Sequence, residues 1–132
     1  MKNNFFLIFF LLFYSNFLIA GELDIKAKNI TIDKKTRITI FKNNVEVKDQ
    51  FDNLLKADYV EYNKESNFLK LMGNINSSDA SGNIFISEKA TYDNNLKIFK
   101  SLGKTYLETI KGYKVETSDI TLDNNKSSIT SN

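Results

Sequence analysis

Four residue types are missing from this chain of 132 residues: cysteine, histidine, tryptophan and proline. Without cysteine there is no disulfide framework, no thiol nucleophile and no thiolate metal site. Without histidine there is no imidazole base, so a Ser-His-Asp triad and the common zinc sites are excluded. Only carboxylates, Lys, Tyr, Ser and Thr remain for chemistry. We therefore expect a protein that is not an enzyme and that uses no metal or cofactor.

Net charge is also small. The chain has 18 basic and 16 acidic residues, and the formal net charge of +2 is spread evenly along it. This balance argues against a nucleic acid as the partner. The length allows one domain. Asparagine is abundant, at 17 residues, and together with the Lys and Ile content we attribute this to the nucleotide composition of the source.

Residues 1–20 form a separate segment. A positive start at Lys2 is followed by an unbroken apolar run over residues 5–14, and the segment ends on the small residue Ala20. This order is typical of a secretory signal. A membrane anchor needs about 20 apolar residues, and this run is shorter and has two polar interruptions. We expect residues 1–20 to be a cleaved signal peptide, with a signal helix, and residues 21–132 to be the exported domain. A retained anchor is the alternative.

The exported part repeats every 30 residues. One column of the repeat is Asp33, Asn63, Asp93 and Asp123. Apolar columns precede it at fixed distances of one, three and eight residues. They are Ile32, Tyr62, Tyr92 and Leu122; Ile30, Val60, Ala90 and Ile120; and Ile25, Leu55, Phe85 and Val115. A fixed period of this length indicates supersecondary units that bury their apolar faces by stacking on one another.

Within each repeat the apolar residues alternate as they do in a strand. Ile25 and Ala27 alternate with lysines, and the alternation then changes phase so that Ile30 and Ile32 continue it. A repeated change of phase predicts a bulge or bend that keeps one face inward while the strand turns a corner. Stacked copies of such strands predict an all-β fold of two antiparallel sheets that face each other.

Polar columns mark the turns. The Asp/Asn column begins a four-residue polar turn in each copy, and Asx hydrogen bonds explain it better than a carboxylate pair or a calcium site. The column of Asn43, Gly73 and Gly103 suits a left-handed backbone, and we interpret it as a tight turn before a short third strand. Residues 74–83 are rich in Gly, Ser and Asn, which predicts a longer loop.

The repeat columns resemble those of a known family. Residues 56–75, KADYVEYNKESNFLKLMGNI, and residues 87–109, SEKATYDNNLKIFKSLGKTYLET, follow the pattern A-D-x-[apolar]-x-Y-[ND], an apolar pair, and G-N-[apolar]. This is similar to the OstA-like (organic solvent tolerance) family of lipopolysaccharide transport. The similarity covers about residues 23–132 and is strongest in the second copy. The first copy departs from it, with Asn43 in place of glycine.

The resemblance implies a twisted, two-sheet antiparallel β-jellyroll that is open at its ends, with acyl chains of lipopolysaccharide between the sheets. It implies a periplasmic location. The partners it implies are lipopolysaccharide and other jellyroll-domain proteins of a transport bridge, joined by edge-strand addition. The soluble bridge LptA, the anchored LptC and the N-terminal domain of LptD are all compatible. Because the fourth copy ends at Asn132, before its expected glycine, we expect an incomplete domain. We favour the LptD-type domain, which adds outer-membrane association through a barrel, or the LptA-like protein.

The interior lining is the expected lipid-binding surface. Each buried methylene gains about 0.8 kcal/mol, and many similar weak contacts let a lipid slide. The predicted lining residues are Ile25, Ile30, Ile32, Ile38, Ile40, Val45, Leu55, Val60, Tyr62, Phe68, Ile75, Phe85, Tyr92, Ile98, Val115, Ile120 and Leu122.

Two other classes of protein share some of these features. A secreted, repetitive β protein with a structural or adhesive role would have the same signal and the same repeats, but a sealed core that binds no lipid. An enzyme acting on surface polysaccharide would need a pair of carboxylates, and no two stand out from the repeat pattern. The interior therefore separates the conduit from the structural protein.

Overall fold

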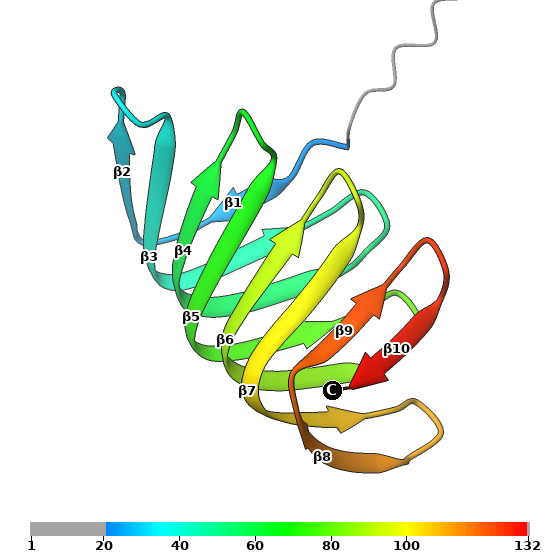
Figure 1. Ribbon diagram of the computed structural model, residues 1–132. Helices are drawn as coiled ribbons and strands as arrows, with labels where there is room; N and C mark the ends of the chain where they lie inside the picture. The colour runs from blue at the N-terminus through cyan, green and yellow to red at the C-terminus, as the bar shows by residue number, and fades with distance from the viewer. Residues whose placement is uncertain (1–20, 132) are drawn as a thin grey trace, which may run out of the picture.

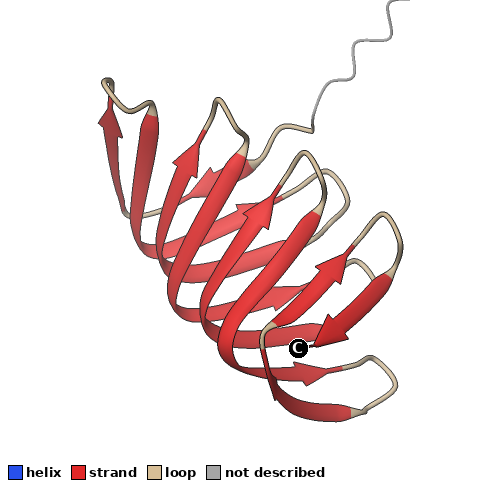
Figure 2. Ribbon diagram, in the orientation of Figure 1, coloured by secondary structure: helices blue, strands red, loops and turns tan. Residues whose placement is uncertain are grey.

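The computed structural model describes residues 21–131, and these residues form strands and turns only (Figures 1 and 2). The expected all-β class is confirmed. The signal segment, residues 1–20, lies outside the described residues, and in residues 21–131 there is no helix that could cross a membrane. The strands are β1 (Asp24–Lys26), β2 (Asn29–Asp33), β3 (Ile38–Lys48), β4 (Leu54–Asn63), β5 (Phe68–Ser78), β6 (Ile84–Asp93), β7 (Ile98–Glu108), β8 (Lys114–Ser118), β9 (Ile120–Asp123) and β10 (Ser128–Ser131).

All neighbouring strands are antiparallel and belong to one hydrogen-bonded sheet that folds back on itself. Figure 1 shows each long strand as a U, with its bend on one side of the molecule and its turns on the other. Each strand from β3 to β7 therefore contributes to two facing layers. We call them leaf 1, formed by β2, residues 38–42, 59–63, 68–72, 89–93 and 98–102, β9 and β10, and leaf 2, formed by β1, residues 45–48, 54–56, 75–78, 84–87 and 104–108, and β8.

The bend lies at the column of Asn43, Gly73 and Gly103. All three have a left-handed backbone, with φ of 64°, 78° and 80°. Strand pairing is irregular between Lys42 and Val45 on β3, and between Lys56 and Tyr59 on β4, where the apolar alternation changes phase. The predicted left-handed column and the predicted bulge are confirmed. The interpretation of this column as a tight turn is wrong, because the strand continues through it into the second leaf.

The loop predicted over residues 74–83 is also wrong in extent. β5 continues to Ser78, and only the turn at residues 79–83 is left outside strands. The small polar residues of this stretch misled the prediction, because they lie on the second half of a strand rather than in a loop. Ser77, for example, is buried inside leaf 2.

The polar turns after the Asp/Asn column are Asx turns, as expected. In each copy the side-chain oxygen of this residue accepts hydrogen bonds from the backbone N–H groups two and three residues later, as Asp93 does from Asn95 and Leu96 at 3.0 and 2.9 Å. The other three copies repeat the pattern. These turns join β2 to β3, β4 to β5, β6 to β7 and β9 to β10.

Asparagine side chains connect the successive hairpin turns of each leaf. In leaf 1 the Asn95 side chain donates to the Ser66 carbonyl at 3.0 Å, and Asn125 donates to Leu96 in the same way at 2.8 Å. In leaf 2 the Asn53 side chain accepts from the Ala80 N–H at 3.1 Å. Much of the asparagine content thus has a structural role, which the attribution to nucleotide composition did not assign.

The core lies between the two leaves. It is formed by inward-facing apolar side chains of both leaves: Phe41, Val45, Val47, Leu55, Ala57, Val60, Leu69, Leu71, Ile75, Phe85, Ala90, Tyr92, Phe99, Leu107, Ile120 and Leu122. Phe85 and Phe99 meet across the leaves with their ring centroids 5.9 Å apart. The two-layer arrangement predicted from the repeats is therefore confirmed.

Replacing Gly103 by Ala should lower the free energy of unfolding by about 1–2 kcal/mol, the cost of a left-handed backbone for a residue with a Cβ atom. A Cβ at Gly103 meets no atom within 4 Å, so the loss measures the backbone alone. Gly103→Asn should cost less, because Asn43 occupies the same place in the first copy and tolerates this conformation. Urea unfolding gives the three values. Equal stability of Gly103→Ala and wild type would show that the bend does not require this backbone.

Candidate functional site

The inner faces of the two leaves form a continuous apolar surface, which we call the trough. Of the predicted lining residues, eight are buried and face inward: Val45, Leu55, Val60, Ile75, Phe85, Tyr92, Ile120 and Leu122. Ile25 and Tyr62 are half-buried and pack against the same core. The structure thus brings together most of the set on one surface, and their contact with lipid stays a prediction.

Four predicted lining residues lie on the other face: Ile38, Ile40, Phe68 and Ile98. Phe68 pairs directly with Asn63, and Ile98 with Asp93, across the Asx hairpins. Residues directly opposite each other in an antiparallel pair share a face, so a residue five positions after the Asp/Asn column faces outward with it. The inward residues are the next ones along the chain, such as Leu69 and Phe99.

Three more predicted residues face inward but are exposed. Ile30 and Ile32 are 56% and 67% exposed, although Ile30 pairs with the buried Phe41. Val115 at the opposite end is 43% exposed and pairs with the buried Leu107. The reason is position: β2 and β8 are edge strands, and no further strand covers them.

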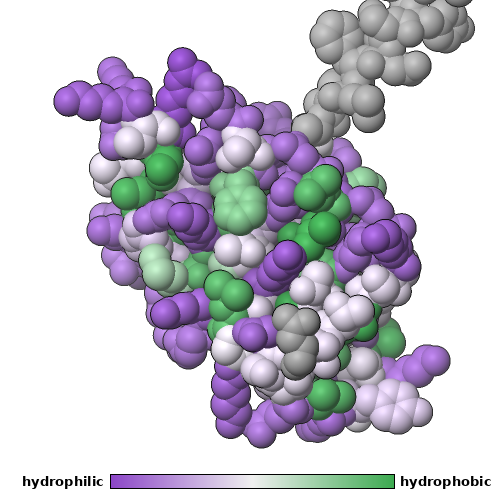
Figure 3. All heavy atoms as spheres, in the orientation of Figure 1, coloured by the Kyte–Doolittle hydropathy of each residue, from purple (hydrophilic) through white to green (hydrophobic). Residues whose placement is uncertain are grey.

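The trough therefore reaches solvent at both edges of the molecule. At the β10 edge, Ile129 faces inward opposite Leu122 and is 40% exposed. Figure 3 shows hydrophobic residues exposed among hydrophilic ones on the face seen in Figure 1. The unpaired backbone groups of an edge strand are a template for another strand, and here they lie beside uncovered apolar side chains.

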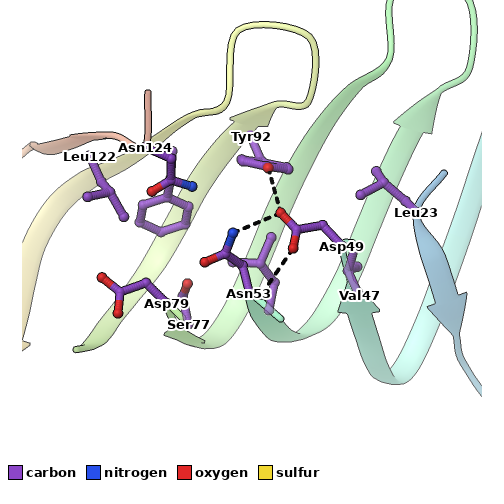
Figure 4. A pocket seen from close by; sticks show the side chains of 11 residues that line it. Leu23, Val47, Asp49, Asn53, Ser77, Asp79, Tyr92, Leu122 and Asn124 are labelled. Atoms are coloured by element: carbon purple, nitrogen blue, oxygen red, sulfur yellow. Dashed lines mark hydrogen bonds between the residues drawn. The ribbon is translucent and has the colours of Figure 1, made fainter. Parts of the chain in front are cut away.

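The side opposite the bends is where the turns of the two leaves approach each other, and we call it the rim. A cavity at the rim is lined by side chains of both leaves, among them Leu23, Val47, Asp49, Tyr92 and Phe99 (Figure 4). Its volume is about 20 Å³, little more than the room for one water molecule. The interior is therefore closely packed in this structure.

Asp49 is a buried carboxylate at the rim. It begins the turn between β3 and β4, and its Oδ1 accepts hydrogen bonds from the N–H groups of Phe51 and Asn53 at 2.8 and 3.0 Å. Its Oδ2 accepts from Asn53 Nδ2 at 2.8 Å and from the Tyr92 hydroxyl at 3.1 Å. The last bond crosses from leaf 2 to leaf 1, and Figure 4 shows the two side chains pointing at each other. We call this contact the rim clasp.

Two further contacts cross the rim close to the clasp. Lys97 of the β6–β7 turn places its Nζ 5.3 Å from the ring centroid of Phe51, a cation–π contact. The buried Asn94 side chain donates to the Gly21 carbonyl at 2.9 Å, so the backbone that leads into β1 is held against leaf 1. The β3–β4 turn and the start of β1 thus close this part of the rim together.

The environment of Tyr92 keeps its hydroxyl protonated, so that it acts as a hydrogen-bond donor. Burial, and then the negative charge of Asp49, raise the pKa of the Tyr92 hydroxyl well above its ordinary value. The hydroxyl therefore keeps its proton throughout the physiological range. In residues 21–131 no cluster of acidic side chains could hold a metal ion. The clasp is one carboxylate that accepts hydrogen bonds from neutral donors, which is typical of a structural contact.

The sequence carries a signal for the Asp49 turn that is not among the repeat columns described above. Asp49 and Asn53 recur thirty residues later as Asp79 and Asn83. Asp79 makes the same bonds, from the Ser81 and Asn83 N–H groups at 2.9 Å and from Asn83 Nδ2 at 2.7 Å. The column marks the turns of leaf 2, where the strands do reverse. Tyr92 belongs to a repeat column of its own, but its pairing with Asp49 joins the two leaves and cannot be read from the spacing.

The clasp predicts a pH dependence of stability. Because the pKa of Tyr92 is raised in the folded chain, its contribution is complete below the unfolded value of about 10 and is lost as the pH rises further. The free energy of unfolding should therefore fall above pH ~10 in the wild type and fall less in Tyr92→Phe. Urea unfolding at a series of pH values measures both slopes. Parallel curves would contradict the buried hydroxyl.

Comparison with known proteins agrees with this architecture. No family model and no curated protein matches the sequence. Among solved structures, the chain is similar to LptH, the LptA-homologous periplasmic component of the lipopolysaccharide transport device of Pseudomonas aeruginosa. The TM-score is 0.74 and the sequence identity 13%, over 83% of this chain and 81% of LptH. The chain therefore has the LptA-like jellyroll fold, which confirms the resemblance to the OstA-like family at the level of the fold.

Proposed function

We propose that this protein is a non-catalytic conduit for lipopolysaccharide, part of the periplasmic bridge that delivers it to the outer membrane. The observation that carries the proposal is the trough, an inward apolar face that runs from edge to edge and stays uncovered at both ends. A sealed structural core would cover Ile30, Ile32 and Val115, which are instead exposed. The fold shared with LptH, a component of a lipopolysaccharide transport device, supports the same function.

The chemistry of the trough suits a moving acyl chain. Val, Ile, Leu and Phe side chains line it from β3 to β9. Burial of each methylene group that enters stabilises the complex by about 0.8 kcal/mol, and this free energy is nearly the same at every position. A chain can therefore advance without breaking a strong directed bond. The buried polar groups, such as Ser101 and Thr105, bond to each other at 2.7 Å and offer the lipid no anchor.

The edges suit a bridge of several jellyrolls. β1 and β2 form one edge, and β8 and β10 the other. Strand addition at these edges satisfies their free N–H and C=O groups. The same step joins the inward faces of neighbouring domains, because Ile30 and Ile129 then gain apolar neighbours. The proposed partners are accordingly other jellyroll domains. These edges suit an LptA-like bridge protein and an LptD-type domain next to an outer-membrane barrel equally well.

The structural or adhesive alternative is favoured by one observation. The interior is packed, with Phe85 at 0% exposure and a cavity of about 20 Å³. For a protein that binds no lipid, a packed core of this kind is sufficient. The two functions differ in whether inward side chains touch lipid when the protein works.

A photo-crosslinking side chain placed at Phe99 should capture lipopolysaccharide in cells of the source, since Phe99 faces the trough. The same group at Phe68 should capture none, because Phe68 faces outward. Both positions carry an aromatic ring, so benzoylphenylalanine is a small change at each. Adducts are detected with an antibody to lipopolysaccharide after electrophoresis. With the fold intact by circular dichroism, no adduct at Phe99, or equal adducts at both positions, would favour the structural protein.

A further inference from the structure

The trough is closed in this structure by the apolar core and by a few directed contacts between the leaves. The inward side chains of Val60, Leu69 and Ile75 are 0% exposed, so an acyl chain finds no room between the leaves. If the protein carries lipid as proposed above, the leaves must separate. The bends and the rim are the two places where the leaves are joined.

The leaves cannot part at the bends. Five long strands pass from one leaf to the other there, from β3 to β7, and the backbone is continuous through each bend. The left-handed residues at the bends, such as Gly73 and Gly103, let the backbone turn without side-chain clashes. The bends therefore act as the hinge side, and separation is confined to the rim.

At the rim, the repeat offers two equivalent places for a clasp, and only one carries it. Asp49 faces Tyr92, whereas Asp79, which has the same turn, lies beside Leu122 at the edge of the same cavity. Leucine has no hydroxyl, so Asp79 accepts three hydrogen bonds where Asp49 accepts four. Next to Leu122 the rim has a hollow of about 320 Å³, lined also by Phe51, Asp79, Lys97 and Ile129.

We propose that the rim clasp between Asp49 and Tyr92 is a gate for acyl chains. The rim is open beside Asp79 and Leu122, where a chain enters, and it is closed at Asp49 and Tyr92, where the chain must part the leaves to advance. Phe51 and Lys97 contact each other and line the hollow at the open place. The Phe51 ring is 52% exposed, and together with the Lys97 stem it forms an apolar lip over the hollow.

The first test uses single hydroxyls. The apparent affinity of a ligand is reduced by the fraction of protein that is not in the binding state. A hydrogen bond to a charged group is worth at least ~1.5 kcal/mol, so its loss shifts binding about tenfold. Tyr92→Phe should therefore bind parinaric acid, a fluorescent fatty acid, about tenfold more tightly than wild type. Leu122→Tyr, which places a hydroxyl beside Asp79, should bind it more weakly.

Tyr59→Phe is the matched control. Tyr59 lies on the outer face of leaf 1, and its hydroxyl also donates to a carboxylate, Glu61 Oε1, at 2.8 Å. Its removal costs a hydrogen bond away from the trough and the rim, so parinaric acid affinity should stay at the wild-type value. Equal affinity changes in Tyr92→Phe and Tyr59→Phe would overturn the gate, since the effect would then follow general loosening.

The second test locks the rim. The chain has no cysteine, so Phe51→Cys with Lys97→Cys supplies the only two thiols, one on each leaf. A reducible bis-maleimide that joins them should abolish parinaric acid binding, and cleavage of its internal disulfide should restore it. The control pair, Ser66→Cys with Asn95→Cys, joins adjacent turns of leaf 1 and should leave binding unchanged. Undiminished binding by the locked protein would overturn the gate.

The same experiments separate the gate from the function on which it rests. If wild type and the uncrosslinked variants all bind parinaric acid but the lock and Tyr92→Phe have no effect, the conduit stands and the gate is wrong. If neither wild type nor Tyr92→Phe binds the probe, and Phe99 yields no lipopolysaccharide adduct, both are wrong.

Discussion

The structure depends on one constraint, that a strand which turns a corner must keep its apolar side inward. Side chains alternate along a strand, and β5 keeps one alternation through its bend, with Leu71 and Ile75 inward on either side of the left-handed Gly73. β4 and β6 change phase at the bend, β4 between the inward residues Ala57 and Val60. Strand pairing is irregular at the same places, so an extra residue there keeps the apolar side chains inward. The trough exists because this pattern recurs at the same place in successive repeats.

The rest of the fold keeps the repeats in register. A slip of one residue between neighbouring strands would turn every inward side chain outward, so the buried core fixes the register. Asparagines at the turns add to this, because Asn95 reaches the Ser66 carbonyl and Asn53 reaches the Ala80 N–H. Each bond joins one repeat to its neighbour at a fixed offset. The turns thus close hairpins and also align the copies along both sides of the rim.

The period of thirty residues predicted most of the architecture and about half of the site. Columns before the Asp/Asn position, such as Val60 and Tyr92, were placed correctly because they share one strand. Phe68 and Ile98 were misplaced because their face depends on how the chain pairs across the turn, and the pairing of Asn63 with Phe68 is not visible in apolar spacing. The clasp was missed for the related reason that its two residues meet across leaves. The thirty-residue spacing predicts contacts within a repeat, but it does not predict which residues meet across the two leaves.

A conduit that is packed when empty must satisfy two opposing demands. Its inward face has to bury itself well enough to keep the protein folded and soluble, and it has to give way when lipid arrives. Apolar packing meets both, because contacts between Leu69 and the opposite leaf are replaced by similar contacts with a methylene chain, at little net change in free energy. Directed bonds across the interior would have no such replacement. They lie at the two margins of the trough, with Ser101 and Thr105 beside a bend and the Asp49–Tyr92 and Asn94–Gly21 contacts at the rim. The apolar middle of the trough is therefore free to exchange protein for lipid, and the cost of opening falls on the rim.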